Sequence, residues 1–99
     1  MMKMNIMRFE WDPVKNAKNQ RKHRIDFREA KTVFQDEKAI KIDDEEHSQD
    51  EDRYAIVGLS LRNRELYVCH CYRGDGDVIR IISARKATEA EKEMYERGF

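Results

Sequence analysis

Residues 54–86 read YAIVGLSLRNRELYVCHCYRGDGDVIRIISARK, and in this stretch three apolar segments are separated by two short polar turns. The apolar segments, at 54–61, 66–73 and 78–84, have the length and composition of β-strands. The second turn, at 74–77, pairs glycines with aspartates, which is typical of a hairpin. Three consecutive strands joined by short turns predict an antiparallel meander, and this meander decides the fold class.

Helices are predicted on both sides of the meander. Asp12 caps a helix over 14–23, because aspartate accepts from backbone N–H groups and the proline that follows fits the first helical turn. Asp26 begins a second helix, and Thr88 begins a third that runs to residue 97. Each is followed three residues later by a glutamate, the spacing of a capping box. The apolar residues of the second helix recur at helical spacing and are predicted to be core: Phe27, Ala30, Val33 and Phe34.

Two further strands complete the expected order. Residues 8–11 alternate polar and aromatic side chains, as a strand does. Residues 38–42 form a short strand before an acidic loop at 43–52. The order β-α-α-β-β-β-β-α predicts an α+β two-layer domain, a mainly antiparallel sheet with the helices packed on one face. We expect residues 1–99 to form this one domain, with a modest core.

The net charge of zero hides a strong segregation of charge. Residues 13–33 carry seven Lys/Arg and two acidic residues, and residues 53–86 carry seven and three, whereas residues 43–52 carry seven acidic residues and no Lys/Arg. Basic patches on a neutral chain suit a face that binds nucleic acid or phosphate. The alternative for any single run is a solvated surface.

The chain lacks sequence signals for membranes, cofactors and metals. No apolar run approaches the roughly 20 residues that cross a bilayer, and the first residues lack a signal-peptide cleavage site, so we expect a cytoplasmic protein without membrane contact. No Walker loop, zinc signature, dinucleotide glycine pattern or serine-hydrolase motif is present. Cys69 and Cys71 share one face of a predicted strand and His70 faces the other way. We therefore expect no disulfide, no metal site and no cofactor.

His23 is the first candidate for chemistry. It ends a basic helix, and histidine is the side chain best suited to proton transfer near neutral pH. A helix C-terminus favours the protonated imidazole, so a structural partner of the helix dipole is the alternative.

Arginines and tyrosines on the predicted strands form the second set of candidates. Guanidinium groups bind phosphate oxygens bidentately and stabilise developing negative charge, and tyrosines such as Tyr67 and Tyr72 can stack on RNA bases. The alternatives are surface ion pairs and core aromatics. Arg80 stands in an apolar strand, so its charge needs a partner, either a phosphate or a structural carboxylate. Strict alternation puts Arg80 and Arg85 on opposite faces, and a bulge or the strand end must redirect one of them if both serve one site.

Motifs spread over nearly the whole chain resemble the BrnT toxins of bacterial type II toxin–antitoxin systems. The N-terminal matches are Phe9-Glu10-Trp11-Asp12, Lys15, Asn19, Lys22-His23, Phe27, Ala30, Val33-Phe34 and Asp36. The middle and C-terminal matches are His47-Ser48, Glu51, Arg53-Tyr54, Gly58, Arg80-Ile81-Ile82-Ser83-Ala84-Arg85, Ala87-Thr88, Glu91 and Tyr95. The family usually has glycine after the Lys-His pair, where this chain has Arg24. Arg24 must therefore adopt a left-handed conformation or let the helix end differently.

The resemblance implies a RelE-like fold, RNA cleavage without metal, and inhibition of translation and growth. It implies neutralisation by a BrnA-like ribbon-helix-helix antitoxin, through which alone the toxin would reach operator DNA. The expected reaction is attack of an RNA 2′-hydroxyl on the adjacent phosphate. The roles that we expect on this basis are His23 as general acid or base, Arg64, Arg80 and Arg85 on the phosphate, and Lys22, Arg62, Arg73 and Tyr72 on the RNA strand. The alternative functions are a non-catalytic nucleic-acid-binding module and an antitoxin-binding module.

Overall fold

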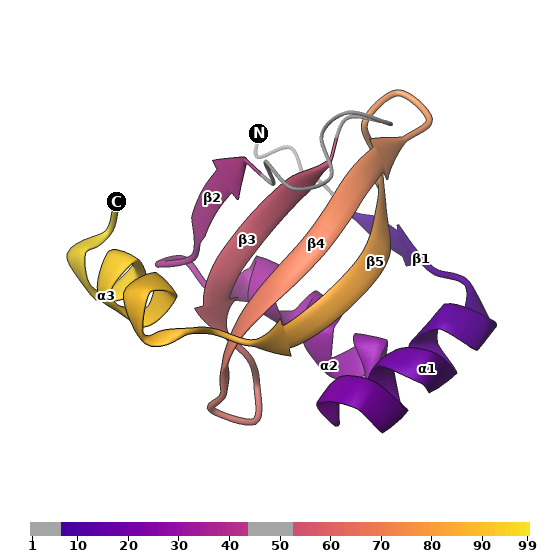
Figure 1. The fold of residues 1–99 in the computed structure, drawn as a ribbon. Coiled ribbons are helices and arrows are strands. Elements are labelled where there is room, and N and C mark those ends of the chain that lie inside the picture. Colours follow the sequence, from indigo (N-terminus) through magenta and orange to yellow (C-terminus); the bar gives the residue numbers. More distant parts are fainter. Residues whose placement is uncertain (1–6, 44–52) are drawn as a thin grey trace.

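The computed structural model describes residues 7–43 and 53–99, and most of the predicted acidic loop lies outside them. The strands form a five-stranded sheet in the order β1-β5-β4-β3-β2 (Figure 1). They are β1 (Arg8–Glu10), β2 (Ile40–Asp43), β3 (Tyr54–Leu59), β4 (Glu65–Arg73) and β5 (Val78–Lys86). The helices are α1 (Pro13–His23), α2 (Phe27–Ala30), the 3₁₀-helix η1 (Lys31–Gln35) and α3 (Glu89–Arg97).

The predicted α+β class and the order of the elements are confirmed. β2, β3, β4 and β5 pair antiparallel, and only β1 pairs parallel with β5. The second predicted helix is an α-helical turn that continues as 3₁₀-helix. Its predicted core residues are confirmed, since Phe27, Ala30 and Val33 are fully buried and Phe34 packs against them.

The helices begin where the sequence predicts. Asp12 accepts a hydrogen bond from the Val14 N–H (2.9 Å), and Thr88 and Glu91 form the complete capping box of α3. α1 ends because Arg24 adopts the left-handed conformation (φ 62°, ψ 27°), and its N–H donates to the Gln20 carbonyl (2.9 Å). Of the two possibilities that the sequence left for Arg24, the chain takes the left-handed one.

A β-bulge in β5 decides which side chains share a face. Cys69 pairs with Ser83 and His70 with Ile81, so Ile82 has no opposite residue on β4. Beyond this point the alternation of β5 shifts by one residue, and Ala84 joins Ile81 in the core. Arg80 and Arg85 consequently lie on the same face of the sheet, opposite the core. The bulge that would allow Arg80 and Arg85 to serve one site is therefore present.

The prediction that His70 faces away from the two cysteines is confirmed. His70 is fully buried on the core face, where its ring lies 4.8 Å from that of Phe34, and Cys69 and Cys71 lie on the other face. Burial lowers the pKa of His70, and its Nδ1 lies 3.1 Å from the Val68 carbonyl oxygen. His70 is therefore a core side chain.

α3 lies on the side of the molecule away from α1 (Figure 1). The Tyr95 hydroxyl donates to Asp36 Oδ2 (2.6 Å), and the same oxygen accepts from the Leu59 N–H at the end of β3 (2.8 Å). Burial and the Asp36 carboxylate raise the pKa of Tyr95 to about 12. Gly58 lets the segment of Asp36 and Ala39 approach β3 closely, because a Cβ at residue 58 would lie 2.8 Å from the Ala39 Cβ.

Candidate active site

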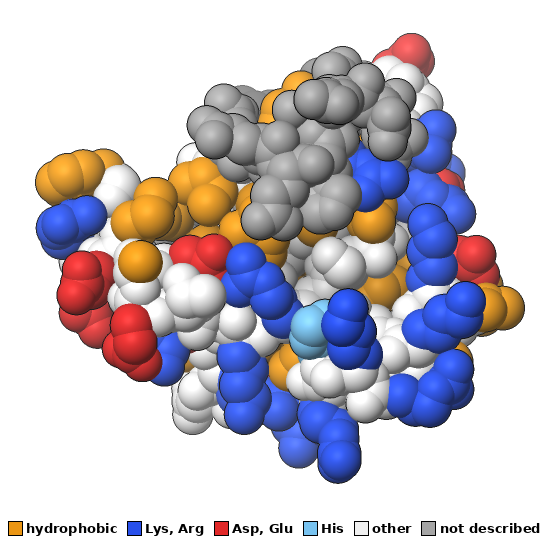
Figure 2. Space-filling view, viewed as in Figure 1, with side chains coloured by type: hydrophobic (Ala, Val, Ile, Leu, Met, Phe, Trp, Pro, Cys, Tyr) orange, Lys and Arg blue, Asp and Glu red, His pale blue; other side chains and the backbone are white. Residues whose placement is uncertain are grey.

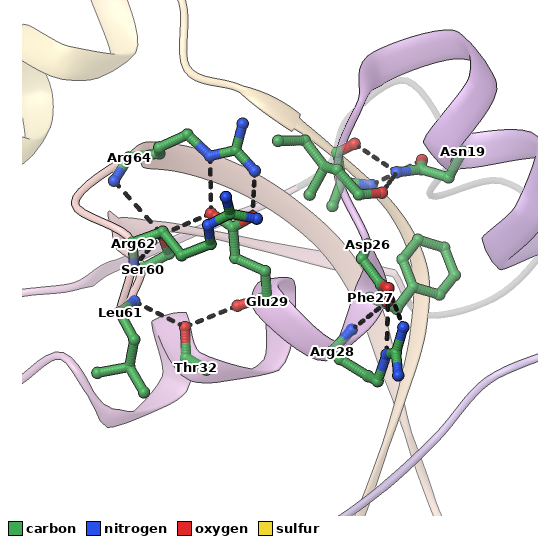
Figure 3. Close-up of polar contacts among 12 residues, drawn as sticks. Asn19, Asp26, Phe27, Arg28, Glu29, Thr32, Ser60, Leu61, Arg62 and Arg64 are labelled. Atoms are coloured by element: carbon green, nitrogen blue, oxygen red, sulfur yellow. Dashed lines mark hydrogen bonds and ion pairs between the residues drawn. The ribbon is translucent and has the colours of Figure 1, made fainter.

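α1 runs beside β5 beyond the point where β1 ends (Figure 1). β1 pairs with β5 only as far as Arg80, and farther along β5 the buried Asn19 takes the place of a neighbouring strand. The Ala84 N–H donates to Asn19 Oδ1 (3.1 Å), and Asn19 Nδ2 donates to the Ala84 carbonyl (2.9 Å) (Figure 3). The same Nδ2 donates to the carbonyl of Ile25 (2.9 Å). Asn19 therefore joins the C-terminal half of α1 to the end of β5.

His23 lies at the end of α1, four residues after Asn19 and half-buried. Burial lowers the pKa of His23, and the positive charges of Lys22 and Arg85 lower it further. A helix C-terminus favours the protonated imidazole, whereas burial and the two cations act in the opposite direction. Since the ordinary pKa is 6.5, the imidazole is mostly neutral at pH 7 and can accept a proton.

Arg85 is held in place on two sides. Its guanidinium carbon lies 4.0 Å from the centroid of the ring of Tyr67, the residue paired with it on β4. Its two terminal nitrogens donate to the carboxylate of Glu91, at 2.8 and 3.0 Å. Burial alone would raise the pKa of Glu91, but the hydrogen bonds from Arg85 and from the Thr88 backbone lower it. Arg85 therefore presents a charge in a fixed orientation, and this charge acts on His23.

The surface around this pair is basic. Figure 2 shows Lys and Arg side chains gathered around a histidine, over α1 and the lower ends of β4 and β5, whereas acidic side chains gather over α3. Lys22 is exposed next to His23, and a shallow depression of about 430 Å³ lies on α1 between Arg21 and Arg24. Phosphate groups are attracted to such a surface.

Arg64 lies in a second, more buried network at the β3–β4 turn (Figure 3). Its Nε donates to Glu29 Oε2 (2.9 Å), and its Nη2 donates to the other oxygen. The Ser60 hydroxyl also donates to Glu29 Oε2 (2.7 Å). The hydrogen bond from Arg64 is the main cause that lowers the pKa of Glu29, and the charge of the exposed Arg62 adds to it. This network attaches the turn to α2.

The sequence left a phosphate or a structural carboxylate as the partner of Arg80, and the structure provides a carboxylate, that of Glu10. Arg80 Nη1 lies 2.7 Å from Oε2 of Glu10, the residue opposite it on β1. The side chains of Arg80 and Glu10 are 31% and 44% exposed, so the pair lies at the surface. Arg80 can therefore also meet a ligand on the outer face.

Tyr72 and Arg73 lie at the far end of β4. The Tyr72 ring packs against His70 (5.4 Å between centroids) and Tyr54 (5.5 Å) on the core face. Arg73 is exposed at the turn that follows. Six residues separate Arg73 from Tyr67, about 20 Å along a strand. The structure therefore brings together His23, Lys22 and Arg85, and it leaves Tyr72 and Arg73 apart from them.

Three residues that support this arrangement were not singled out for the site from the sequence. They are Asn19, Glu91 and Tyr67, of which Tyr67 was considered, together with Tyr72, only as a side chain that could stack on RNA bases. Tyr67 faces Arg85 because of the β4–β5 register, which includes the bulge. Asn19 shares a helix face with His23, a spacing that is visible in the sequence. The described residues contain no cluster of three or more potential metal ligands and no helix long and apolar enough to cross a membrane.

Residues 11–91 match the family model described as "Ribonuclease toxin, BrnT, of type II toxin-antitoxin system". The chain belongs to this BrnT toxin family, and membership implies an RNA target and an antitoxin partner. The fold is similar to that in the crystal structure of the Brucella abortus ribonuclease toxin BrnT, with a TM-score of 0.65 and 22% sequence identity. The match covers 85% of this chain and 100% of that one. A comparison with curated proteins gave no match.

Proposed function

We propose that this protein is an endoribonuclease toxin that cleaves RNA without a metal ion, by attack of a ribose 2′-hydroxyl on the adjacent phosphate. The observation that carries the proposal is that Asn19 joins the helix ending in a half-buried histidine, His23, to the strand of Arg85, whose guanidinium is oriented by Glu91 and Tyr67 and whose charge acts on His23. This reaction needs a proton acceptor and a fixed cation, and water can supply the proton for the leaving oxygen.

In the proposed step, the neutral imidazole of His23 takes the proton from the 2′-hydroxyl. The 2′-oxygen forms a bond to phosphorus, and the bond from phosphorus to the 5′-oxygen breaks. The leaving 5′-oxygen takes a proton from a water molecule, and the resulting hydroxide removes the proton from His23, which restores the neutral imidazole. The products are a 2′,3′-cyclic phosphate and a 5′-hydroxyl. Arg85 stabilises the negative charge that develops on the phosphate oxygens. The lowered pKa of His23 supports the role of general base.

The remaining basic residues take different parts in the proposal. Lys22 is exposed and contacts the RNA backbone near the reacting phosphate, and Arg62, exposed at the β3–β4 turn, contacts another part of the RNA backbone. Arg80 lies on the same sheet face as Arg85 and contacts a neighbouring phosphate. Arg64 supports the turn through Glu29, so we give it a structural role. Arg73 lies about 20 Å from Tyr67 along β4, and only a longer RNA would reach it. Tyr72 packs against His70 and Tyr54 on the core face, so we give it a structural role.

The test is cleavage of a single-stranded RNA by purified protein in EDTA, with analysis of the product ends. We expect cleavage to continue and the new 3′ ends to carry cyclic phosphate. Cleavage that stops in EDTA and returns with a divalent ion would overturn the mechanism. RNA binding without cleavage, and expression without growth arrest, would favour the non-catalytic nucleic-acid-binding or antitoxin-binding module instead.

We further propose that the antitoxin is a BrnA-like ribbon-helix-helix protein and that the toxin acts in the cytoplasm. Family membership supports an antitoxin, and the basic surface over α1 and the lower ends of β4 and β5 supports a partner that carries acidic residues there. Co-purification with the product of a neighbouring small gene tests this proposal. Loss of RNA cleavage in the complex is the expected result, and full cleavage in the complex would contradict it.

A further inference from the structure

The edge of β5 beyond Arg80 poses a hydrogen-bonding problem that Asn19 solves. β1 has ended, so the N–H and carbonyl of the buried Ala84 that point away from β4 have no strand to pair with. Buried backbone groups need partners. The carboxamide of Asn19 carries a donor and an acceptor, as a peptide group does, and it pairs with both groups of Ala84 at 2.9 and 3.1 Å. An aspartate would lack the donor, and a shorter side chain would lack the reach.

This contact lies between the two proposed reacting residues. Ala84 immediately precedes Arg85, and Asn19 lies one helical turn before His23 on the same helix face. The second bond of Asn19 Nδ2, to the carbonyl of Ile25 (2.9 Å), also fixes the chain just after His23. One side chain therefore connects the segment that carries the histidine to the segment that carries the arginine.

We infer that Asn19 is a positioning residue for RNA cleavage, which holds His23 at a fixed separation from Arg85 through its two hydrogen bonds to Ala84. The inference rests on the proposed function for its kinetic consequence, but its structural consequence can be measured without RNA. Asn19 does not touch the substrate in this account. It acts through the placement of α1, and a misplacement of a catalytic group by about 1 Å can lower a rate by about 10²-fold.

Asn16 provides a matched control in the same helix. Asn16 Oδ1 accepts from the Phe27 N–H (2.9 Å) and its Nδ2 donates to Asp26 (3.3 Å), so it also joins α1 to a later segment. Those partners belong to the start of α2 and not to β5. Asn16→Ala therefore removes comparable hydrogen bonds without releasing His23 from Arg85.

The experiment compares Asn19→Ala, Asn19→Gln and Asn16→Ala with the wild-type chain. The readouts are the pKa of His23 from NMR titration of its imidazole, kcat and KM for an RNA oligonucleotide, and Tm. The charged groups that act on His23 are Lys22, on its own helix, and Arg85, on β5. In Asn19→Ala we expect the His23 pKa to rise toward 6.5, as burial and the field of Arg85 weaken, and kcat to fall about 10- to 100-fold with KM little changed.

Asn19→Gln separates positioning from stability. It keeps the carboxamide but adds a methylene, so it retains hydrogen bonds only if α1 moves away from β5. We expect a Tm nearer to wild type than that of Asn19→Ala, with the pKa and kcat still altered. Should Asn19→Ala not fold, Asn19→Gln carries the test alone.

A wild-type His23 pKa and kcat in folded Asn19 variants would overturn the inference, and so would equal changes in Asn16→Ala. A wild-type protein that cleaves no RNA would overturn the proposed function, while the NMR titration would still decide whether Asn19 positions His23.

Discussion

Arg64–Glu29 and Arg85–Glu91 are the same kind of contact in two different surroundings. In each pair, two guanidinium nitrogens donate to the two oxygens of one carboxylate. The Glu29 side chain is 6% exposed and also accepts from the Ser60 hydroxyl. The groups that act on the Glu29 carboxyl are Arg64, Ser60 and Arg62, and His23 is not among them. Arg85 is 35% exposed and acts on His23. The comparison teaches that an arginine's role depends on what lies beside the ion pair.

Arg64→Ala should have the largest effect on stability. It leaves the buried Glu29 carboxylate unpaired, so the free energy of unfolding should fall by about 3–5 kcal/mol. Denaturant unfolding measures this loss. Cleavage per folded molecule should stay near wild type, and a stable Arg64→Ala protein with abolished cleavage would move Arg64 into the active site.

Arg85→Lys should show the opposite pattern. Lysine keeps a positive charge for Glu91 but loses the bidentate geometry and the stacking on Tyr67. The rate of RNA cleavage should fall by about 10²–10³-fold, with a change in unfolding free energy below about 1 kcal/mol. Wild-type cleavage by this variant would remove Arg85 from the proposed reaction, and the two pairs would then both be structural.

Arg24→Gly should stabilise the protein. Arg24 is in the left-handed region (φ 62°), where glycine meets no steric penalty. Glycine removes the steric penalty but brings a larger entropy to the unfolded chain. We expect the net increase in unfolding free energy to be about 0.5–1 kcal/mol. The control is Lys31→Gly in the neighbouring 3₁₀-helix, where φ is negative and stability should fall. A destabilised Arg24→Gly protein would mean that the arginine side chain makes a contribution of its own.

Arg80→Ala should have the smallest effect on stability. Its partner Glu10 is 44% exposed, and such surface pairs contribute about 0–1 kcal/mol. Thermal unfolding of Arg80→Ala beside Arg64→Ala compares the two directly. A loss as large as that of Arg64→Ala would show that the β1–β5 pairing depends on this ion pair.

The sequence predicted the parts of the fold that local chemistry determines. The Gly/Asp turn at 74–77, the cap at Asp12 and the capping box of Thr88 each act within a few residues, and the structure has all three elements. The bulge opposite Cys69 and His70 was foreseen only as a condition for a common site of Arg80 and Arg85. Its position is a feature of the pairing between β4 and β5, and no local pattern in the sequence specifies it.

The candidate site was less predictable because it depends on long-range pairing. Glu29 and Arg64 are 35 residues apart, and Asn19 and Ala84 are 65 apart. The prediction that Arg64 and Arg85 share one site therefore rested on residue type alone, and in the structure they pair with different carboxylates, Glu29 and Glu91. The sequence indicated only that a helix C-terminus favours protonated His23. Burial and the charges of Lys22 and Arg85, which lower the pKa of His23, depend on the fold.

The most direct test of the account is the rate of RNA cleavage by wild-type and His23→Ala protein as a function of pH. For the wild type, kcat/KM should fall as the pH falls through the pKa of His23, since the base becomes protonated, and the inflection should lie below 6.5 because burial and two cations lower that pKa. Folded His23→Ala protein should lose about 10²–10⁴-fold in rate and lose the inflection. Near-wild-type cleavage by folded His23→Ala, with the acid limb intact, would contradict the central claim that His23 beside Arg85 is the reacting pair.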